Sequence, residues 1–346
     1  MYTVAGLSIP IARFLGFAGV IDLERTNRFL EDSLVRKVCG LEVEDFLIAD
    51  NAPFLKDIAG KFKDLYRIVP HSVVLEKLET HNPMFYGVLF SQKGCMNSAL
   101  FCQEVVSFLL KKYPQRFSLY EHTHIQKVAL HEGYAVLDAV SHTIEAKRVV
   151  LCTNGFENIH ILNKSGLDID IRLHHELQGV VGFMSGYLKK YDKPPVAISY
   201  IMPTNSPLDG DYIYLTRREY EFEGVDKKNL ISIGGPEVSL EDGGEYGSDR
   251  DYPEEAQESI DLFAKNFFEK KDGPPIHYTF QWHGLMGYTT SGVRLVGSEP
   301  KNPVLLYNLG CNGIGILPSI FGGDRISRII SGEFIKPSIF DPKSEV

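Results

Sequence analysis

The sequence has 346 residues and a net charge of −9, with 44% hydrophobic and 23% charged residues. This length and composition are enough to bury a large core and to form two domains. The negative charge and the lack of long Lys/Arg runs argue against nucleic acid and anionic membranes as partners. The cysteines are odd in number and lack metal-ligand spacing, which predicts a reducing, cytoplasmic setting and no metal site: Cys39, Cys95, Cys102, Cys152 and Cys311.

The first 22 residues are apolar, but they predict neither a signal peptide nor stable membrane insertion. They have no basic start, and Arg13 interrupts the apolar run. A helix is predicted next, over Arg25–Gly40. Short helices are expected between Val43 and Val88, and a strand over Met84–Phe90.

The following stretch predicts a helix and a series of strands. Ser98–Lys112 has an apolar side typical of an amphipathic helix. A central strand is predicted over Arg148–Cys152, and it ends in the turn Thr153-Asn154-Gly155. Four shorter strands are predicted between the helix and this strand: Phe117–Tyr120, Ile125–Leu130, Tyr134–Ala139 and Thr143–Glu145.

A second set of strands is predicted after residue 170. Ile171–Met184 is predicted to be a strand containing His174 and His175. Adjacent residues of a strand point to opposite faces, so these two histidines are not expected to bind one metal ion. Three antiparallel strands and then a helix follow: Val196–Met202, Tyr212–Arg217, Leu230–Gly234 and Glu254–Phe268.

One of these strands carries candidate binding residues. Alternation along Tyr212–Arg217 places Tyr212, Tyr214 and Thr216 on one face and Arg217 on the other. Tyrosine edges and an arginine are suited to lining a cavity and binding a carboxylate. The alternative is that the tyrosines pack and the arginines pair with glutamates at positions 219, 221 or 223.

The chain is organised around Leu305–Gly332, which predicts a strand, a glycine turn and a helix closed by Gly332. Such a turn lets a ligand approach the backbone and directs N–H groups and the positive helix end towards it. An ordinary turn with packing glycines is the alternative. Gly322 and Gly323 within the helix each cost about 1 kcal/mol relative to alanine, so a bulky neighbour is expected there.

Gln281–Gly297, with its W-x-G-L, Y-T-x-x-G and V-G steps, precedes the sequence N-L-G-C-N-G-I-G. Together they resemble the C-terminal signature of the flavin-dependent amine and D-amino acid oxidase family. The resemblance implies an α/β FAD-binding domain of the glutathione-reductase type, interleaved with an α+β substrate domain built on an antiparallel sheet. It assigns 93–170 and 298–346 to the first, and 1–92 and 171–297 to a helical entry segment and the second.

The resemblance also implies roles for individual residues. The flavin is expected at Gly310, Cys311, Asn312, Gly313, Ile314 and Gly315, and the rest of FAD near Val128, Thr153, Asn154 and Gly155. Val128 and Gly155 have core packing and a plain turn as alternatives, and Cys311 is either a redox thiol or a packed residue. The substrate side is expected to include His283, Tyr288, Tyr214 and Arg217.

Two departures from the family qualify this expectation. Met286 stands where glycine oxidase-like members carry an arginine for the substrate carboxylate, so recognition of simple α-amino acids by that position is not expected. Gly284 aligns with the cysteine that attaches flavin in sarcosine oxidase-like members. FAD is therefore predicted to be bound non-covalently.

The family usually begins with a strand, a G-x-G-x-x-G turn and a helix, and this motif does not occur in the sequence. Either the given chain is truncated at its N-terminus or the lineage has lost the element, and a partner chain is expected to cover its place. The activity implied is oxidation of a C–N bond in a small-molecule amine or amino acid by hydride transfer to flavin N5. A non-catalytic or partner-dependent binding or scaffold subunit and a 2-hydroxy acid oxidase are the alternatives.

Overall fold

The computed structural model describes residues 2–4, 7–9, 12–40, 45–58, 60–95, 97–155, 159–202, 212–221, 226–240, 246–269 and 272–343. The chain forms two compact units, each assembled from separate segments. Unit 1 comprises Met1–Glu104, Phe183–Glu237 and Asp251–His283, and unit 2 comprises Val105–Gly182, Val238–Arg250 and Gly284–Val346. The domain boundaries inferred from the family resemblance stay a prediction.

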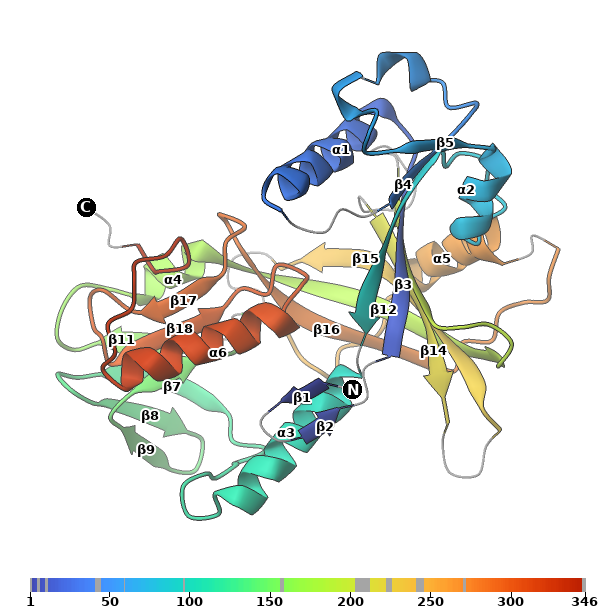
Figure 1. Ribbon diagram of the computed structural model, residues 1–346. Coiled ribbons are helices and arrows are strands. Elements are labelled where there is room, and N and C mark those ends of the chain that lie inside the picture. The colour runs from blue at the N-terminus through green and yellow to red at the C-terminus, as the bar shows by residue number, and fades with distance from the viewer. Residues whose placement is uncertain are drawn as a thin grey trace. The chain divides into compact units, whose positions relative to one another are not determined.

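Unit 1 is built on a nine-stranded mixed sheet, with the strand order β16-β12-β15-β14-β13-β3-β6-β4-β5 (Figure 1). The predicted antiparallel set is confirmed, because β14 pairs antiparallel with both β13 and β15. The strands are β3 (Ala12–Val20), β4 (Asp45–Ala49), β5 (Arg67–Val69), β6 (Gly87–Cys95), β12 (Leu177–Lys190), β13 (Val196–Ile201), β14 (Tyr212–Tyr220), β15 (Lys228–Ser239) and β16 (Phe280–Thr289).

The apolar N-terminal stretch is explained by its place in this sheet. After the small hairpin of β1 (Tyr2–Val4) and β2 (Leu7–Ile9), β3 lies in the interior of the sheet, parallel to β13 and antiparallel to β6. Phe17 and Val20 of β3 are buried, so the apolar side chains at this end of the strand belong to the core. Within the described residues, none of the helices combines the length and apolar character needed to cross a bilayer.

The helices of unit 1 cover two hydrophobic clusters. The predicted first helix is confirmed as α1 (Leu23–Val38), and the Asp22 side chain caps it by accepting a hydrogen bond of 2.9 Å from the Arg25 N–H. One cluster includes Leu30 and Phe46, and the other includes Tyr200. The remaining elements are the short 3-10 turns η1 (Leu55–Asp57) and η2 (Gly60–Phe62), α2 (His71–Lys77), α5 (Glu254–Phe263) and the π-helical turn η3 (Ala264–Phe268).

Two predictions in unit 1 need correction. The region 43–88 is not only helical, because it contains β4 and β5. Four of the five residues of β4 are buried, a run too short for the sequence to separate from a helix. The strand predicted over Met84–Phe90 begins at Gly87 and continues to Cys95.

Unit 2 contains two smaller sheets (Figure 1). The predicted meander is confirmed as β7 (Ile125–Leu130), β8 (Ala135–Ala139) and β9 (Thr143–Ala146), joined by β11 (His160–Asn163) in the order β11-β7-β8-β9. The second sheet has the order β10-β18-β17, with β10 (Val149–Leu151) parallel to β18 (Leu305–Leu309) and β17 (Leu295–Ser298) antiparallel to it. The helix α6 (Ile316–Ile330) packs on this sheet.

Three predictions in unit 2 are wrong. Phe117–Tyr120 is not a strand; Leu119 and Tyr120 are exposed, so the apolar residues mark no buried segment. Among the described residues β10 lies at a sheet edge rather than at the centre. The stretch over 171–184 starts as the helix α4 (Asp170–Glu176), which becomes β12 only at Leu177.

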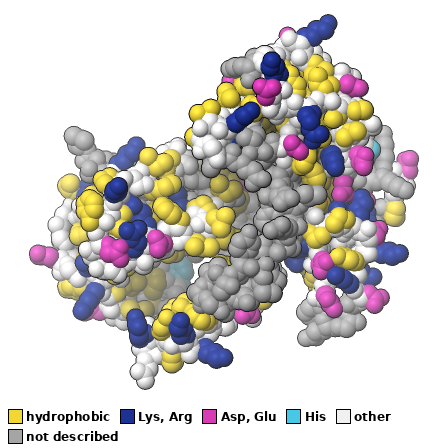
Figure 2. Space-filling view, viewed as in Figure 1, with side chains coloured by type: hydrophobic (Ala, Val, Ile, Leu, Met, Phe, Trp, Pro, Cys, Tyr) yellow, Lys and Arg dark blue, Asp and Glu magenta, His cyan; other side chains and the backbone are white. Residues whose placement is uncertain are grey.

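The helices α4, α3 and α6 agree with the sequence-based predictions to different degrees. His174 and His175 lie on α4, so the strand argument applied to them was wrong. The helix α3 (Ser98–Lys112) has the predicted bounds, but none of its residues is buried. The end of α6 is as predicted: Gly332 has φ +77°, and its N–H and that of Glu333 donate to the carbonyls of Ile329 and Arg328. Figure 2 shows Lys and Arg interspersed with Asp and Glu on the visible face.

Candidate cofactor site

The glycine turn after β18 is the centre of the candidate site. All five residues of β18 are buried, and the chain then turns through Gly310 (φ +78°), Asn312 (φ +47°) and Gly313 (φ +78°) into α6. A side chain at Gly310 would also overlap Thr289, because its Cβ position lies 2.5 Å from the Thr289 methyl group. These backbone angles and the tight packing explain the glycines of the turn.

Two asparagines fix the turn to neighbouring strands. Asn154, itself at φ +61°, accepts a hydrogen bond of 3.1 Å from the Cys311 N–H. Asn312 accepts one of 2.8 Å from the Thr289 N–H and donates from its backbone N–H to the Gly287 carbonyl at 3.0 Å. The turn at 153–155 and the turn at 310–315, far apart in sequence, are thus held together.

This arrangement also requires Gly287. A Cβ placed there would lie 1.6 Å from the Asn154 carbonyl oxygen, so β16 and the turn at 153–155 meet backbone to backbone. Gly155 likewise has the Leu285 side chain 2.4 Å from its Cβ position. Sequence reasoning gave Gly155 a place in the site but did not single out Gly287.

A buried arginine supports the turn from behind. Arg294 is 7% exposed, and its Nε donates to Asn308 Oδ1 at 3.0 Å. Its other nitrogens donate to the Gly310 carbonyl at 3.3 Å and to Ser319 Oγ at 2.8 Å. Arg294 therefore joins the end of β18 to the first turns of α6. It was not among the predicted site residues, because a single arginine in the loop before β17 carries no local signal for such a role.

The side of the turn formed by the start of α6 is open. Among the residues that the structure describes, no side chain caps the N-terminus of α6 at Gly315, and the first turn has no acidic residue. The first N–H groups of such a helix lack partners within the helix and carry the positive end of its dipole. Ile314 is 75% exposed and Leu317 is 73% exposed, so apolar surface lies beside these N–H groups.

The second turn contributes an unsatisfied polar atom. Thr153 Oγ1 is buried, and among the described residues it has no hydrogen-bond partner. Leaving a buried hydroxyl unpaired costs about 1–3 kcal/mol, so such atoms usually have a ligand or another partner. The turn backbone, the uncapped helix and this hydroxyl fit a planar group that has apolar faces and accepts negative charge.

Two other predicted cofactor residues, Val128 and Cys311, pack against other parts of the protein. Val128 is 1% exposed in β7, which pairs with β8 on one edge and β11 on the other. Cys311 packs back against the turn, with its Cβ 2.8 Å from the Cβ position of Gly315. These positions agree with the packing alternatives for both residues; their roles towards FAD stay predictions.

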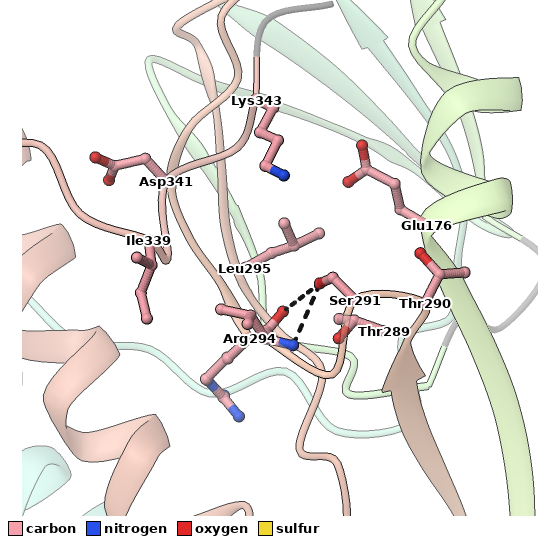
Figure 3. Close-up of a pocket in the computed structure, with 10 residues that line it drawn as sticks. Glu176, Thr289, Thr290, Ser291, Arg294, Leu295, Ile339, Asp341 and Lys343 are labelled. Carbon is pink, nitrogen blue, oxygen red and sulfur yellow. Dashed lines mark hydrogen bonds between the residues drawn. The ribbon is translucent and has the colours of Figure 1, made fainter.

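A small pocket with both polar and apolar lining residues lies next to the turn within unit 2. It has a volume of about 150 Å³, and Glu176, Ser291 and Lys343 are among the residues that line it (Figure 3). Ser291 Oγ is within 3.2 Å of the Val293 N–H and 3.4 Å of its carbonyl. Pockets for small-molecule ligands usually measure about 300–1,000 Å³, so this one is not assigned to a substrate.

Arg217, a predicted substrate residue, is bound to Glu79. Its Nη1 and Nη2 donate to the two carboxylate oxygens of Glu79 at 2.7 Å each, and its Nε donates to the Pro194 carbonyl at 2.8 Å. Burial alone raises the pKa of the Glu79 carboxyl, but hydrogen bonds and positive charge from Arg217 and Lys193 outweigh this and lower it. The Arg217 side chain is 3% exposed, so its guanidinium serves the core of unit 1.

The Arg217–Glu79 ion pair borders a cavity in unit 1. This cavity has a volume of about 600 Å³ and is lined by Leu75, Glu76, Glu79, Thr80, His81, Lys193, Phe268, Glu269 and Asp272. Its carboxylates are already paired in part: Glu79 with Arg217 and Lys193, and Glu269 with Lys189 at 2.8 Å.

The other predicted substrate residues lie on two strands. Tyr214 is half-buried on β14, with its ring 2.6 Å from the Cβ position of Gly234 on β15. His283 and Tyr288 are both on β16, where alternation assigns them to opposite faces. The ring of His283 lies 6.0 Å from that of Phe183. Among the described residues, no group of three or more His, Cys, Asp or Glu is arranged to hold a metal ion.

The family model described as "FAD dependent oxidoreductase" matches residues 28–329, well over half of the chain. The chain belongs to this family of FAD dependent oxidoreductases. The mixed α/β fold class expected from the resemblance is confirmed by solved structures of the same fold. No match was found among curated proteins.

Three structures illustrate the similarity of this oxidoreductase family member to known folds. Glycine oxidase from Geobacillus kaustophilus has a TM-score of 0.64 at 14% identity, with 99% of this chain and 78% of that one covered. L-proline dehydrogenase from P. horikoshii has a TM-score of 0.60 at 12% identity, with 94% of this chain and 74% of that one covered. Fructosyl amine:oxygen oxidoreductase (Amadoriase I) from Aspergillus fumigatus has a TM-score of 0.55 at 13% identity, with 95% of this chain and 68% of that one covered.

Proposed function

We propose that this chain binds FAD non-covalently at the glycine turn and oxidises a C–N bond of a small-molecule amine or amino acid. The observation that carries the proposal is the open end of α6. Its uncapped N-terminus follows a turn with left-handed backbone angles and lies beside apolar surface. A helix N-terminus of this kind favours a group that becomes negatively charged.

The residues of the site have distinct roles in this proposal. Asn154 and Asn312 hold the two turns rigid, so the backbone N–H groups are fixed before the cofactor arrives. Thr153 Oγ1 gains the hydrogen-bond partner that it lacks. Ile314 and Leu317 cover the apolar face of the bound group and exclude water.

When bound, FAD would supply the acceptor for the hydride that leaves the carbon next to the amine nitrogen. The chain then has to orient the substrate and keep its nitrogen neutral, and a dedicated strong base is not needed. Oxidation of a C–N bond is supported by the neighbouring structures, which are named for glycine, L-proline and fructosyl amine as substrates. Tyr288 and Met286 lie on one face of β16 and are proposed to contact the substrate.

A second candidate is a partner-dependent member of the family. In the described part of the chain β10 pairs only with β18, which leaves an unpaired edge. The exposed Ile314 in the glycine turn, and Leu317 and Phe321 on α6, add apolar surface in the same unit. The sequence also has no G-x-G-x-x-G. Open strand edges and apolar patches are typical of surfaces that a further segment covers.

The activity is tested by mixing the FAD-loaded chain without oxygen with panels of amines, amino acids and 2-hydroxy acids. Free FAD with the same compounds is the control. The proposal expects at least one amine or amino acid to bleach the visible flavin absorbance. Bleaching by 2-hydroxy acids alone, or by nothing although FAD stays bound, contradicts it.

A further inference from the structure

Arg218 differs from its neighbour Arg217, which is paired with Glu79. Among the described residues no carboxylate forms an ion pair with Arg218, although its side chain is half-buried in the middle of unit 1. Burial lowers the pKa of Arg218, and the Tyr220 hydroxyl opposes this only in part. A guanidinium that is partly removed from water without a counter-ion is costly, so its retention calls for a compensating anion.

The surroundings of Arg218 form a continuous face of the sheet. Arg218 lies directly opposite Leu230 on β15, so both side chains point to the same side. Leu230 Cδ1 and Trp282 Cζ3 lie 3.3 Å and 3.4 Å from the Cβ position of Gly186 on β12, which places Trp282 on that side too. Arg218, Leu230, Gly186 and Trp282 therefore form one row across the strands.

Aromatic groups border this row. Tyr214 lies on the same face of β14, four residues before Arg218, and covers Gly234. The rings of Tyr220 and Phe280 are 5.7 Å apart. We call Tyr214, Arg218, Leu230 and Trp282 the arginine face. Trp282 is 40% exposed, so part of this face is accessible to a ligand.

The chemistry of the arginine face selects one kind of ligand. One planar guanidinium matches a carboxylate, which it can bind through two parallel hydrogen bonds. The aromatic and aliphatic neighbours suit an apolar or aromatic body attached to that carboxylate.

We propose that Arg218 binds the carboxylate of the substrate and that Trp282 and Tyr214 contact the apolar part of the same molecule. Arg218 then determines specificity for a ligand that carries a carboxylate. Naming the ligand as the substrate rests on the proposed function, whereas binding of a carboxylate to this face requires neither FAD nor turnover.

The test uses the single tryptophan, Trp282, as reporter. Benzoate is titrated into the full chain while tryptophan fluorescence is followed, with benzamide as the neutral probe of the same shape. Arg218→Met removes the charge and keeps the aliphatic stem, and Arg218→Lys keeps the charge without the fork. Lys77→Met, an exposed lysine in the last turn of α2, removes one positive charge elsewhere in unit 1. Circular dichroism checks that each variant is folded.

The proposal expects saturable binding of benzoate to the wild type and to Lys77→Met, and at least about tenfold weaker binding to Arg218→Met. Arg218→Lys should be intermediate, and benzamide should bind weakly to every form. No benzoate binding to the wild type, equal affinity in folded Arg218→Met, or equal affinity for benzamide overturns it.

An activity measurement separates this inference from the proposed function. With an amine that the chain oxidises, Arg218→Met should raise KM for a carboxylate-bearing substrate and spare its neutral analogue. If Arg218→Met turns over both compounds with unchanged KM, Arg218 has no role in substrate binding, and the proposed oxidase activity is not contradicted. If the chain oxidises no amine but Arg218→Met loses benzoate binding, the carboxylate site is supported and the proposed oxidase function is contradicted.

Discussion

At the scale of single residues, the contrast between Arg217 and Arg218 shows what the sequence contained and what it lacked. Alternation along β14 correctly separated the two faces of the strand: Ile213, Leu215 and Arg217 are buried. The partner of Arg217 was not predictable, because Glu79 is 138 positions away and adopts φ +50°. A pattern of period two assigns a face but not the contact made across the core.

Arg217→Ala should destabilise the fold rather than a substrate complex. The substitution leaves the Glu79 carboxylate without its main partner, which typically costs about 3–5 kcal/mol of unfolding free energy for a buried pair. Lys193→Ala is the matched control: it contacts the same carboxylate at 3.0 Å, but its side chain is 56% exposed. Removing an exposed partner should cost less than about 1 kcal/mol.

Urea denaturation of both variants measures this difference. The pKa of Glu79 is lowered in the folded chain, so its stabilisation is complete above the ordinary carboxyl value of 4.5. It is lost as the pH falls through the folded-state value, and the gap between the wild type and Arg217→Ala should therefore narrow in acid. If both variants lose the same small amount of unfolding free energy at neutral pH, the Arg217–Glu79 pair does not stabilise the fold.

At the scale of elements, local signals predicted most of the helices and strands. The bounds of α3 and the C-terminal cap of α6 followed from apolar spacing and from a glycine at the C′ position. The failures occurred where apolar residues had another use. Leu119 and Tyr120 are apolar but exposed, and they led to the prediction of a strand that does not exist. The helix α4 continues directly into β12, and no turn residue between them marks the change.

The two glycines of α6 give a test at this scale. A bulky neighbour was expected at both, but the structure has one only at Gly322, where Asn308 Oδ1 lies 2.3 Å from the Cβ position. Gly322→Ala should displace Asn308 from Arg294 and cost about 1–3 kcal/mol. Gly323 has nothing within 4 Å, so Gly323→Ala should stabilise the chain by about 1 kcal/mol.

Thermal unfolding of the two variants checks the prediction. Both substitutions add the same methyl group to the same helix, so helix propensity contributes equally to each. A melting temperature that rises for Gly323→Ala and falls for Gly322→Ala is expected. Similar shifts in the two variants would mean that Asn308 does not restrict Gly322.

At the scale of the whole molecule, the pairings that build the site are long-range. Val149 in β10 pairs with Leu305 in β18, and Asn154 holds a turn 157 positions away. No local pattern predicts such pairs, so the resemblance carried by residues 281–315 supplied the fold and brought the two turns together. It did not reveal Gly287 or Arg294, whose roles depend on backbone contacts that only the folded chain contains.

The central claim is that the glycine turn holds FAD, and an absorbance spectrum after gel filtration with added FAD tests it most directly. Gly313→Ala and Gly133→Ala make a matched pair, because both replace a glycine at positive φ (+78° and +84°) in unit 2, and only the first lies in the turn. The account predicts flavin bands that travel with the wild type and with Gly133→Ala, and a loss of most bound FAD in Gly313→Ala. A folded wild-type chain that stays colourless, or equal FAD content in the two variants, would contradict it.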